Sequence, residues 1–241
     1  MNYMIRPEAI HRRFHETRDE RARLLWNICL GHLAGNPHIF EGPYLDIGAG
    51  NLSNASFFAR SGVKNAVGVD IRADLAKTKH LALVRADAHA LPFRDRTFEL
   101  VTMFSVIEHV REQLVCLSEA FRVLRSSGFL FLQLPNRNFP IEFHSGLYAY
   151  FYLPRCLRGR LADAAGLGWM KAIDIPSVEN TTRMLRTLEP GRRVLAYPFS
   201  YSEYLLPESR WIRAFYRILL RLNLLSVLPM SYMVIAQSAL D

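Results

Sequence analysis

The chain has 241 residues, of which 50% are hydrophobic and 22% charged, and its formal net charge is +8. This length permits one large α/β domain or two small ones, with a core that needs no disulfides or structural metal. The three cysteines, Cys29, Cys116 and Cys156, are scattered and form no Cys-x-x-Cys pair, which argues against a zinc site or a disulfide framework and favours a reducing compartment. The N-terminus is charged and has no apolar signal-peptide core, so we expect a cytoplasmic protein.

Strands and helices are expected to alternate through the first half of the chain. A helical segment over residues 7–34 comes first, and apolar runs then predict strands over 44–47, 66–69, 81–85, 98–104 and 129–134. Helices are expected between them over 51–61, 73–79 and 112–125, the last ended by Ser126-Ser127-Gly128. Such alternation is typical of βαβ units with right-handed crossovers.

The second half of the chain has a different pattern. After Pro135 we expect a helix over 181–188, a strand over 193–199, a basic amphipathic helix over 207–225 and a last strand over 232–236. The apolar stretch 222–240 contains several polar residues and Pro229, so it is a poor membrane span. The sequence therefore predicts an α/β fold, with a seven-stranded, mostly parallel sheet and helices on both faces.

The most informative segment follows the first expected strand. In Tyr44-Leu45-Asp46-Ile47-Gly48-Ala49-Gly50, a short apolar run carries one acid and then breaks at two glycines. Asp70 ends the second strand, twenty residues past Gly50, and Asp87 follows the third. Ligands of open α/β sheets bind beyond the carboxyl ends of the strands, so this set predicts a site for a nucleoside-bearing cofactor. A nicotinamide dinucleotide fits less well. The Gly-x-Gly-x-x-Gly motif that binds it would need a glycine where this chain has Ser53, and the chain contains no Tyr-x-x-x-Lys motif.

Several motifs together resemble the class I S-adenosylmethionine-dependent methyltransferases, in particular the small-molecule type 11 branch. The resemblance covers about residues 40–136. The matching residues are Leu45-Asp46-Ile47-Gly48-Ala49-Gly50, Gly68-Val69-Asp70, Ala86-Asp87-Ala88, Leu91-Pro92-Phe93, Phe98-Glu99-Leu100-Val101, Val106-Ile107-Glu108-His109-Val110 and Glu119-Ala120-Phe121-Arg122-Val123-Leu124. It implies a Rossmann-like fold and S-adenosyl-L-methionine as cofactor.

The resemblance also implies a role for each cofactor residue. Gly48 and Gly50 would shape the loop under the methionine end of the cofactor, and Asp70 would hold the ribose hydroxyls. Asp87 would accept from the adenine amino group, with the backbone N–H of Ala88 beside it. Ile71 or Leu91 would flank the adenine ring, and Asp46 would either bind cofactor or act as a structural turn acid. One residue departs from the family pattern: Leu52 stands where members often have a small residue.

The domain division follows from these motifs. We interpret residues 1–241 as one methyltransferase domain, with a helical extension over 1–36 and a cofactor-binding core over 40–136. Insertions over 137–176 and 200–229 both leave carboxyl ends of strands, and we expect them to cover the substrate. The first insertion is rich in aromatic residues. The second contains an amphipathic helix with apolar residues at Trp211, Phe215, Ile218, Leu219 and Leu222 and arginines at 210, 213, 217 and 221. We expect either contact with an anionic membrane surface or a packed helix with a solvated arginine face.

Methyl transfer from a sulfonium needs few catalytic residues, because the donor is already electrophilic and the enzyme mainly aligns the acceptor. His144, beyond the fifth strand, is the first candidate for a general base, with Glu142 to orient it, and His109 is the second. Structural roles for both histidines remain open. No tight cluster of acids and histidines appears in the sequence, so we predict no metal.

The acceptor expected from these residues is the hydroxyl of a small-molecule, isoprenoid, glycan or glycolipid compound. An RNA-directed methyltransferase that grips phosphates with its basic second half is an alternative, and so is a non-catalytic S-adenosylmethionine-binding protein. Nucleic acid is the less favoured partner, because no RNA-binding module is appended. A nucleobase amino methylase is disfavoured too, because Ser105-Val106-Ile107-Glu108 stands where an Asn/Asp-Pro-Pro-aromatic motif would be. The oligomeric state is left open.

Overall fold

The computed structural model describes residues 16–50, 52–72, 81–142, 144–206 and 210–238. Within these residues the fold is a seven-stranded sheet with the order β3-β2-β1-β4-β5-β7-β6. Strands β1 to β5 pair in parallel, and β7 runs antiparallel to both of its neighbours. This confirms the predicted mostly parallel, Rossmann-like sheet. The strands are β1 (Tyr44–Ile47), β2 (Ala66–Asp70), β3 (Ala82–Arg85), β4 (Phe98–Phe104), β5 (Leu124–Pro135), β6 (Arg192–Phe199) and β7 (Ser231–Ser238).

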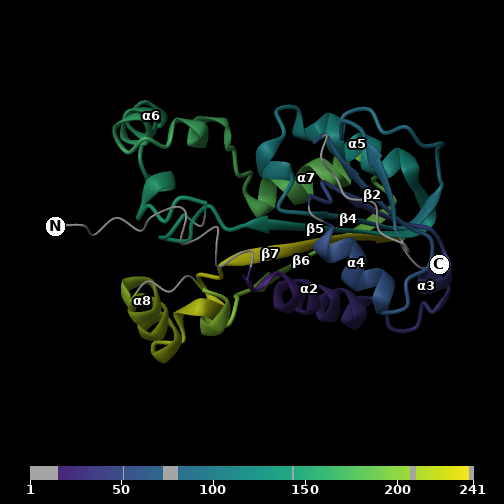
Figure 1. Ribbon diagram of the computed structural model, residues 1–241, viewed down its shortest axis with the longest axis horizontal. Helices are drawn as coiled ribbons and strands as arrows, with labels where there is room; N and C mark the ends of the chain where they lie inside the picture. The colour runs from purple at the N-terminus through teal and green to yellow at the C-terminus, as the bar shows by residue number, and fades with distance from the viewer. Residues whose placement is uncertain (1–15, 51, 73–80, 143, 207–209, 239–241) are drawn as a thin grey trace.

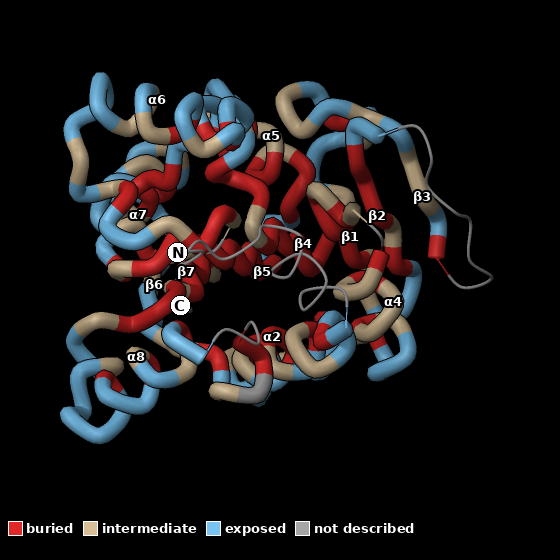
Figure 2. Tube along the Cα trace, turned by 60° about the vertical axis from the view of Figure 1, so that its left-hand side comes forward, coloured by how far each residue is buried: buried red, intermediate tan, exposed pale blue. Residues whose placement is uncertain are grey.

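Helices cover both faces of the sheet, as predicted (Figure 1). On one face lie α2 (Arg18–Leu33) and α4 (Ser53–Arg60), and on the other α5 (Gln113–Val123) and α7 (Val178–Leu188). Helix α2 buries Ala22, Trp26, Cys29 and Leu33, spaced three to four residues apart, and Trp26 packs on Phe58 of α4 with ring centroids 4.6 Å apart. The buried central strands run between these two helical layers (Figure 2).

The start of β5 differs from the prediction. Helix α5 ends at Val123, and the residues expected to terminate a longer helix, 126–128, already belong to β5. Two side chains fix this segment: Arg125 donates to Glu99 Oε1 over 2.7 Å, and Arg192 donates to the carbonyl oxygens of Gly128 and Arg125. Because these bonds join β5 to residues distant in the chain, a local helix-stop signal gave no sign of them.

The remaining boundaries shift by a few residues. Helix α7 begins at Val178 rather than residue 181, because Ser177 Oγ caps it by accepting from the backbone N–H of Asn180. The expected strands gain or lose one or two residues at their ends, and α3 (His38–Glu41) precedes β1. The helix predicted over 73–79 and residues 7–15 of the first expected helix lie outside the described residues, as do residues 207–209 of the last one.

The two insertions project from the carboxyl end of the parallel strands, on opposite sides of the sheet (Figure 1). The first insertion, residues 137–176, contains η2 (Tyr150–Tyr152), α6 (Arg155–Ala164) and η3 (Gly168–Ala172) around its own small core. The second insertion, residues 200–229, contains η4 (Glu203–Leu205), α8 (Arg210–Arg221) and η5 (Leu224–Ser226). Both insertions are therefore placed to reach a ligand at this edge.

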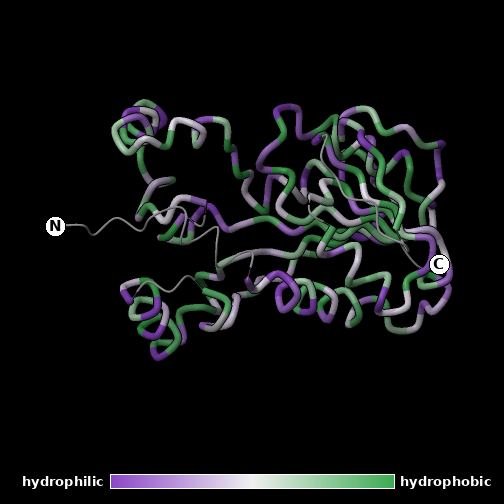
Figure 3. Tube along the Cα trace, in the orientation of Figure 1, coloured by the Kyte–Doolittle hydropathy of each residue, from purple (hydrophilic) through white to green (hydrophobic). Residues whose placement is uncertain are grey.

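Helix α8 buries only part of the apolar face that the sequence predicted: Leu219 is buried and Phe215 packs against the core of the second insertion. Ile212, Tyr216 and Leu219 pack into the core of the second insertion, whereas Trp211 and Ile218 are 64% and 52% exposed. Hydrophobic and hydrophilic residues alternate along this helix (Figure 3). The apolar face of the helix is therefore broader than its buried part.

Candidate active site

The loop after β1 turns through two glycines at the point where the strand order reverses. Gly48 has a φ of +70° and Gly50 a φ of +50°, both in the left-handed region that favours glycine. A Cβ on Gly48 would lie 2.3 Å from Val106 Cγ2, so no larger residue fits. By contrast, the nearest atom to a Cβ on Gly50 would be 3.9 Å away, which leaves open space beside the backbone there. The loop has the room that a bound ligand needs.

Leu52, the departure from the family pattern, is accommodated without opening the turn. Its φ is +65°, its backbone N–H donates to Ala49 O over 2.7 Å, and its side chain is buried. The side chain lies against Gly68 of β2, where a Cβ would come within 2.7 Å of Leu52 Cδ2. Leu52 therefore fills the space above β2.

Asp70 at the end of β2 is joined directly to the glycine loop. Its Oδ2 accepts from the backbone N–H of Gly50 over 2.8 Å, and its Oδ1 accepts from that of Arg72 over 3.0 Å. The carboxylate is nearly buried, and Ile71, beside it, is 63% exposed. Gly50 and Asp70 thus form one rim, with an exposed apolar side chain next to it.

Asp87 and Ala88 follow β3 at the same edge. The backbone N–H of Ala86 donates to Asp70 O over 3.2 Å, which places this segment beside Asp70. Asp87 Oδ1 accepts from the backbone N–H of His89 over 2.9 Å and lies 2.6 Å from His89 Nδ1. These hydrogen bonds, the one from the backbone first, lower the pKa of Asp87, so its half-exposed carboxylate is ionised and available as an acceptor.

Of the two residues expected beside adenine, Ile71 faces outward, whereas Leu91 is 5% exposed and packs in the core under α5. A place for either residue beside the adenine stays a prediction. Two hydrogen bonds hold the backbone of Leu91 in this buried position. Glu119 Oε2 accepts from the N–H of Leu91 over 2.8 Å, and Arg122 Nη2 donates to the carbonyl oxygen of Leu91 over 2.9 Å. Arg122 also donates to Phe93 O, so one guanidinium of α5 holds the loop after Asp87.

Asp46 lies inside β1 rather than in a turn. Its Oδ1 accepts from Thr102 Oγ1 over 2.7 Å, and that hydroxyl lies 2.9 Å from the hydroxyl of Tyr44. Its Oδ2 has no hydrogen-bond partner among the described residues. Burial raises the pKa of Asp46 to about 7, although the bond from Thr102 opposes the shift. Cofactor binding by Asp46 stays a prediction.

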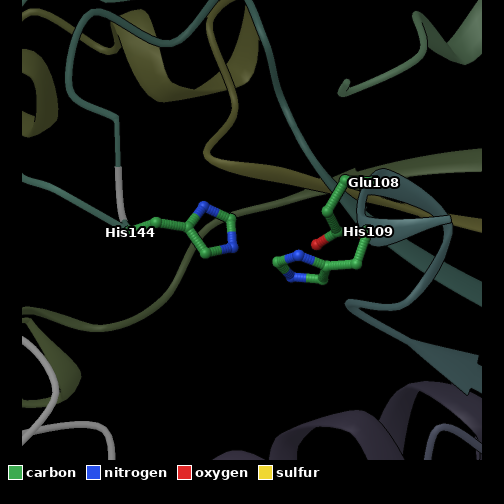
Figure 4. A group of neighbouring side chains, drawn as sticks. All are labelled: Glu108, His109 and His144. Carbon is green, nitrogen blue, oxygen red and sulfur yellow. The ribbon is translucent and has the colours of Figure 1, made fainter. Parts of the chain in front are cut away.

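The two candidate bases meet beyond β4 and β5. His109 ends η1 (Ile107–His109), directly after β4, and His144 belongs to the first insertion. Their ring centroids are 5.1 Å apart, with the rings nearly perpendicular. The carboxylate of Glu108 joins them, so that one ligand atom from each of the three residues lies within 4.8 Å of the others (Figure 4). The sequence analysis missed Glu108 as a site residue, because only the fold brings His144 to it.

Glu142 orients His144, as the sequence suggested. His144 Nδ1 lies 2.6 Å from Glu142 Oε1, whose partner oxygen Oε2 accepts from the N–H and the hydroxyl of Ser145, each over 2.7 Å. Burial alone would lower the pKa of His144, but the bond and charge of Glu142 raise it above the usual value. Partial desolvation of its ring, with the charge of His144, instead lowers the pKa of His109 to about 4, although the residue as a whole is exposed, so His109 is neutral at pH 7.

The first insertion is fastened to this cluster. The backbone N–H of Asp174 donates to Glu108 O over 2.9 Å, and Gln113 Nε2 donates to the carbonyl oxygens of both Ile107 and Asp174. The far end of the insertion therefore returns to η1, and His144 is held over Glu108 and His109. The arrangement places proton-accepting groups at the carboxyl edge, beyond the cofactor loop.

The strand order, the glycine loop and the acids at the rim resemble those of class I S-adenosylmethionine-dependent methyltransferases. Residues 45–132 match the family model described as a methyltransferase domain.

Two curated relatives are similar over part of the chain. A ubiquinone/menaquinone biosynthesis C-methyltransferase, UbiE, from Roseobacter denitrificans is 34% identical over 123 residues, covering 45% of this chain and 48% of the relative. A demethylmenaquinone methyltransferase from Bacillus pumilus is 28% identical over 136 residues, covering 56% of this chain and 51% of the relative. The chain thus spans about half the length of the curated relatives it matches.

Solved structures show the same fold over a longer range. In a complex from Haloferax volcanii between the Trm112 methyltransferase activator and the putative methyltransferase, the matched chain superposes with a TM-score of 0.60, covering 97% of this chain and 99% of that one. At 13% identity this likeness concerns the fold alone. Among the described residues, no helix is long and apolar enough to cross a bilayer.

Proposed function

We propose that this protein transfers the methyl group of S-adenosylmethionine to a small aromatic acceptor that carries a hydroxyl group. The observation that carries the proposal is the rim formed by Gly50 and Asp70, with Asp87 and the exposed Ile71 beside it. A carboxylate at the end of the second strand is suited to ribose hydroxyls, and an exposed apolar side chain is suited to an adenine face. In this proposal Asp46, Gly48 and Ala88 complete the cofactor site.

The acceptor proposed here is a phenol or a reduced quinone, with or without an isoprenoid tail. The two curated relatives carry names of quinone methyltransferases, and one is named a C-methyltransferase. The sequence suggested transfer to a hydroxyl oxygen. Removing the proton of a ring hydroxyl activates both the oxygen and the neighbouring ring carbon, so one site suits either atom. The relatives favour carbon, and we propose a ring carbon as the methylated atom.

His144 and His109 are the proposed proton acceptors. The bond between sulfur and the methyl group breaks with both electrons staying on sulfur, and the hydroxyl proton goes to a base, so that the ring carbon of the resulting phenolate supplies the electron pair of the new bond. The methylated carbon then loses its own proton and the oxygen is protonated again, so that one proton is released overall. Glu142 holds Nδ1 of His144, which leaves Nε2 directed toward His109 and the carboxyl edge. His109 is neutral at pH 7, as a base must be. His144→Ala is expected to keep donor affinity and to reduce turnover by about 10²–10⁴-fold.

The experiment is incubation with labelled S-adenosylmethionine and separate pools of reduced quinones, phenols, glycolipids and RNA. Label in the hydroquinone or phenol pool, lost in Asp70→Ala, supports the proposal. Carbon-13 NMR of the product then distinguishes a methyl group on carbon from one on oxygen. Label only in RNA would favour the nucleic-acid alternative, and donor binding without label in any pool would favour a non-catalytic protein.

We also propose that α8 brings the protein to an anionic lipid surface. Trp211 and Ile218 on this helix are 64% and 52% exposed, Leu222 directly after it is 62% exposed, and the arginines at 210, 213, 217 and 221 lie on the same helix. Exposed apolar side chains next to arginines are typical of helices that lie in a membrane interface. A lipid-borne acceptor would then be reached from the membrane surface.

Co-sedimentation with phosphatidylglycerol vesicles tests this contact. Trp211→Glu and Ile218→Glu should abolish sedimentation, whereas Leu157→Glu, which changes a leucine on α6 that is 45% exposed, should leave it unchanged. Sedimentation that is equal in all three variants would contradict a role for α8.

A further inference from the structure

Three side chains of metal-binding type converge at the acceptor side of the site (Figure 4). Glu108 and His109 come from η1, and His144 approaches them from the first insertion. One atom from each, a carboxylate oxygen or an imidazole nitrogen, lies within 4.8 Å of the others. Two imidazoles and one carboxylate form a donor set that occurs in zinc enzymes and in non-haem iron enzymes.

The carboxylate of Glu108 points independently to a positively charged ligand. Glu108 is 0% exposed, and neither of its oxygens has a hydrogen-bond partner among the described residues. A buried carboxylate without hydrogen-bond partners is costly, because it gives up its hydration. The nearby charge of His144 offsets only part of this cost, since burial still raises the pKa of Glu108 to about 7. A cation bound beside it would supply the missing partner.

His144 is already arranged as a metal ligand would be. Its Nδ1 is held by Glu142 Oε1 over 2.6 Å, which fixes the ring and leaves Nε2 as the ligating atom. Metal-bound histidines usually have such a carboxylate partner behind them. Glu142 is itself held by Ser145, so the support is rigid, and His109 is the exposed member of the group.

The spacing of the three groups describes an open form of the site. Around a zinc ion with bonds of about 2.0–2.2 Å, ligand atoms lie roughly 3.3 Å apart. The three ligand atoms lie within 4.8 Å of one another, so binding of an ion would draw them together by at most about 1.5 Å. Rotation of an exposed imidazole supplies a movement of this size.

We propose that Glu108, His109 and His144 bind one divalent transition-metal ion of the zinc type, with Glu142 as a positioning residue behind His144. Three protein ligands leave at least one coordination position open. At this position the ion would bind the hydroxyl oxygen of the acceptor and lower the pKa of that hydroxyl, so that its proton passes to water. In the metal-bound form this route would replace the proton transfer to His144 and His109 of the proposed function. This use of the ion depends on the proposed function, but binding of the ion does not.

The test measures metal binding to the full chain without donor or acceptor. The protein, free of any polyhistidine tag and stripped with chelator, is titrated with Zn²⁺ in a calorimeter and with Co²⁺ in a spectrophotometer. We expect one ion per chain and visible cobalt bands. Glu108→Gln and His144→Gln should each weaken binding by at least about 100-fold, and Glu142→Gln by about 10–100-fold.

His89→Gln is the matched control, because His89 pairs with Asp87 in the same two-residue spacing as His144 with Glu142. It should bind Zn²⁺ like the unmodified chain. Circular dichroism shows whether each variant is folded. If one of the two ligand variants fails to fold, the other still tests the site. The metal site would be overturned if the unmodified chain bound no stoichiometric Zn²⁺, or if Glu108→Gln and His144→Gln bound Zn²⁺ as tightly as the unmodified chain. Neither result bears on methyl transfer, whose failure would appear only in the labelling experiment.

Discussion

The backbone N–H of Gly50 donates a 2.8 Å hydrogen bond to Oδ2 of Asp70, and this bond joins the loop after β1 to the end of β2. The two residues lie twenty positions apart in the chain, yet they form one rim at the carboxyl edge of the sheet. Asp70 therefore has two tasks: it shapes the glycine loop, and in the proposed function it holds the ribose of the methyl donor.

Replacing Asp70 should weaken donor binding. Asp70→Ala removes a charge-assisted acceptor and the partner of Gly50, so we expect the binding free energy of S-adenosylmethionine to fall by roughly 1.5–3 kcal/mol. Isothermal titration calorimetry measures this. Asp163→Ala, which changes a half-exposed acid in the first insertion, is the control. An unchanged dissociation constant in Asp70→Ala would remove Asp70 from the cofactor site.

Gly48→Ala should destabilise the fold as well as the site. The new methyl group would stand 2.3 Å from Val106 Cγ2 at a φ of +70°, so both a clash and backbone strain oppose it. We expect a loss of about 1–3 kcal/mol in the free energy of unfolding, measured by urea denaturation. Adding Val106→Ala should recover part of the loss, and a double variant no more stable than Gly48→Ala would show that the clash is unimportant.

The raised pKa of Asp46 predicts a dependence of stability on pH. Between about pH 4 and 7 the folded chain keeps a proton on Asp46 that the unfolded chain releases, so the stability from this group is complete below pH 4 and is lost as the pH rises through 7. Asp46→Asn cannot ionise. From pH 4 to pH 8 the unmodified chain should therefore lose on the order of 2–4 kcal/mol more unfolding free energy than Asp46→Asn does.

Urea denaturation at several pH values measures this difference. Asp163→Asn is the control and should follow the unmodified chain, because Asp163 is an exposed partner of Lys171. A pH profile of Asp46→Asn that runs parallel to that of the unmodified protein would mean that Asp46 is ionised in the fold.

Arg122 should support the segment after Asp87. Its guanidinium donates to the carbonyl oxygens of Leu91 and Phe93 and to Glu119, so Arg122→Met removes several bonds at once. We expect the free energy of unfolding to fall by about 1–3 kcal/mol, measured by thermal denaturation followed by circular dichroism. Arg94→Met changes a neighbouring arginine outside this set of bonds and should leave the melting temperature within about 2 °C, a change well under 1 kcal/mol. Equal melting temperatures for the two variants would contradict the role of Arg122.

The sequence predicted those parts of the molecule that depend on local pattern. Apolar runs located the strands, and Gly48, Gly50 and Asp70 marked the carboxyl edge, because glycine turns and strand-end acids are written in a short stretch of chain. Three features depended on distant contacts and were not predicted. Arg192 holds the start of β5 by donating to Gly128 O, and the core of the second insertion determines which residues of α8 are buried. Only the fold brings His144 close to Glu108.

The central claim is that an adenosyl group lies at the rim between Gly50 and Asp70. A crystal structure of the protein with S-adenosylhomocysteine tests it most directly. We predict that the ribose hydroxyls contact the Asp70 carboxylate, with the adenine beside Ile71 and Asp87 and the sulfur facing His109 and His144. A nucleoside bound elsewhere, with Asp70 still occupied only by the backbone N–H groups of Gly50 and Arg72, would contradict the account.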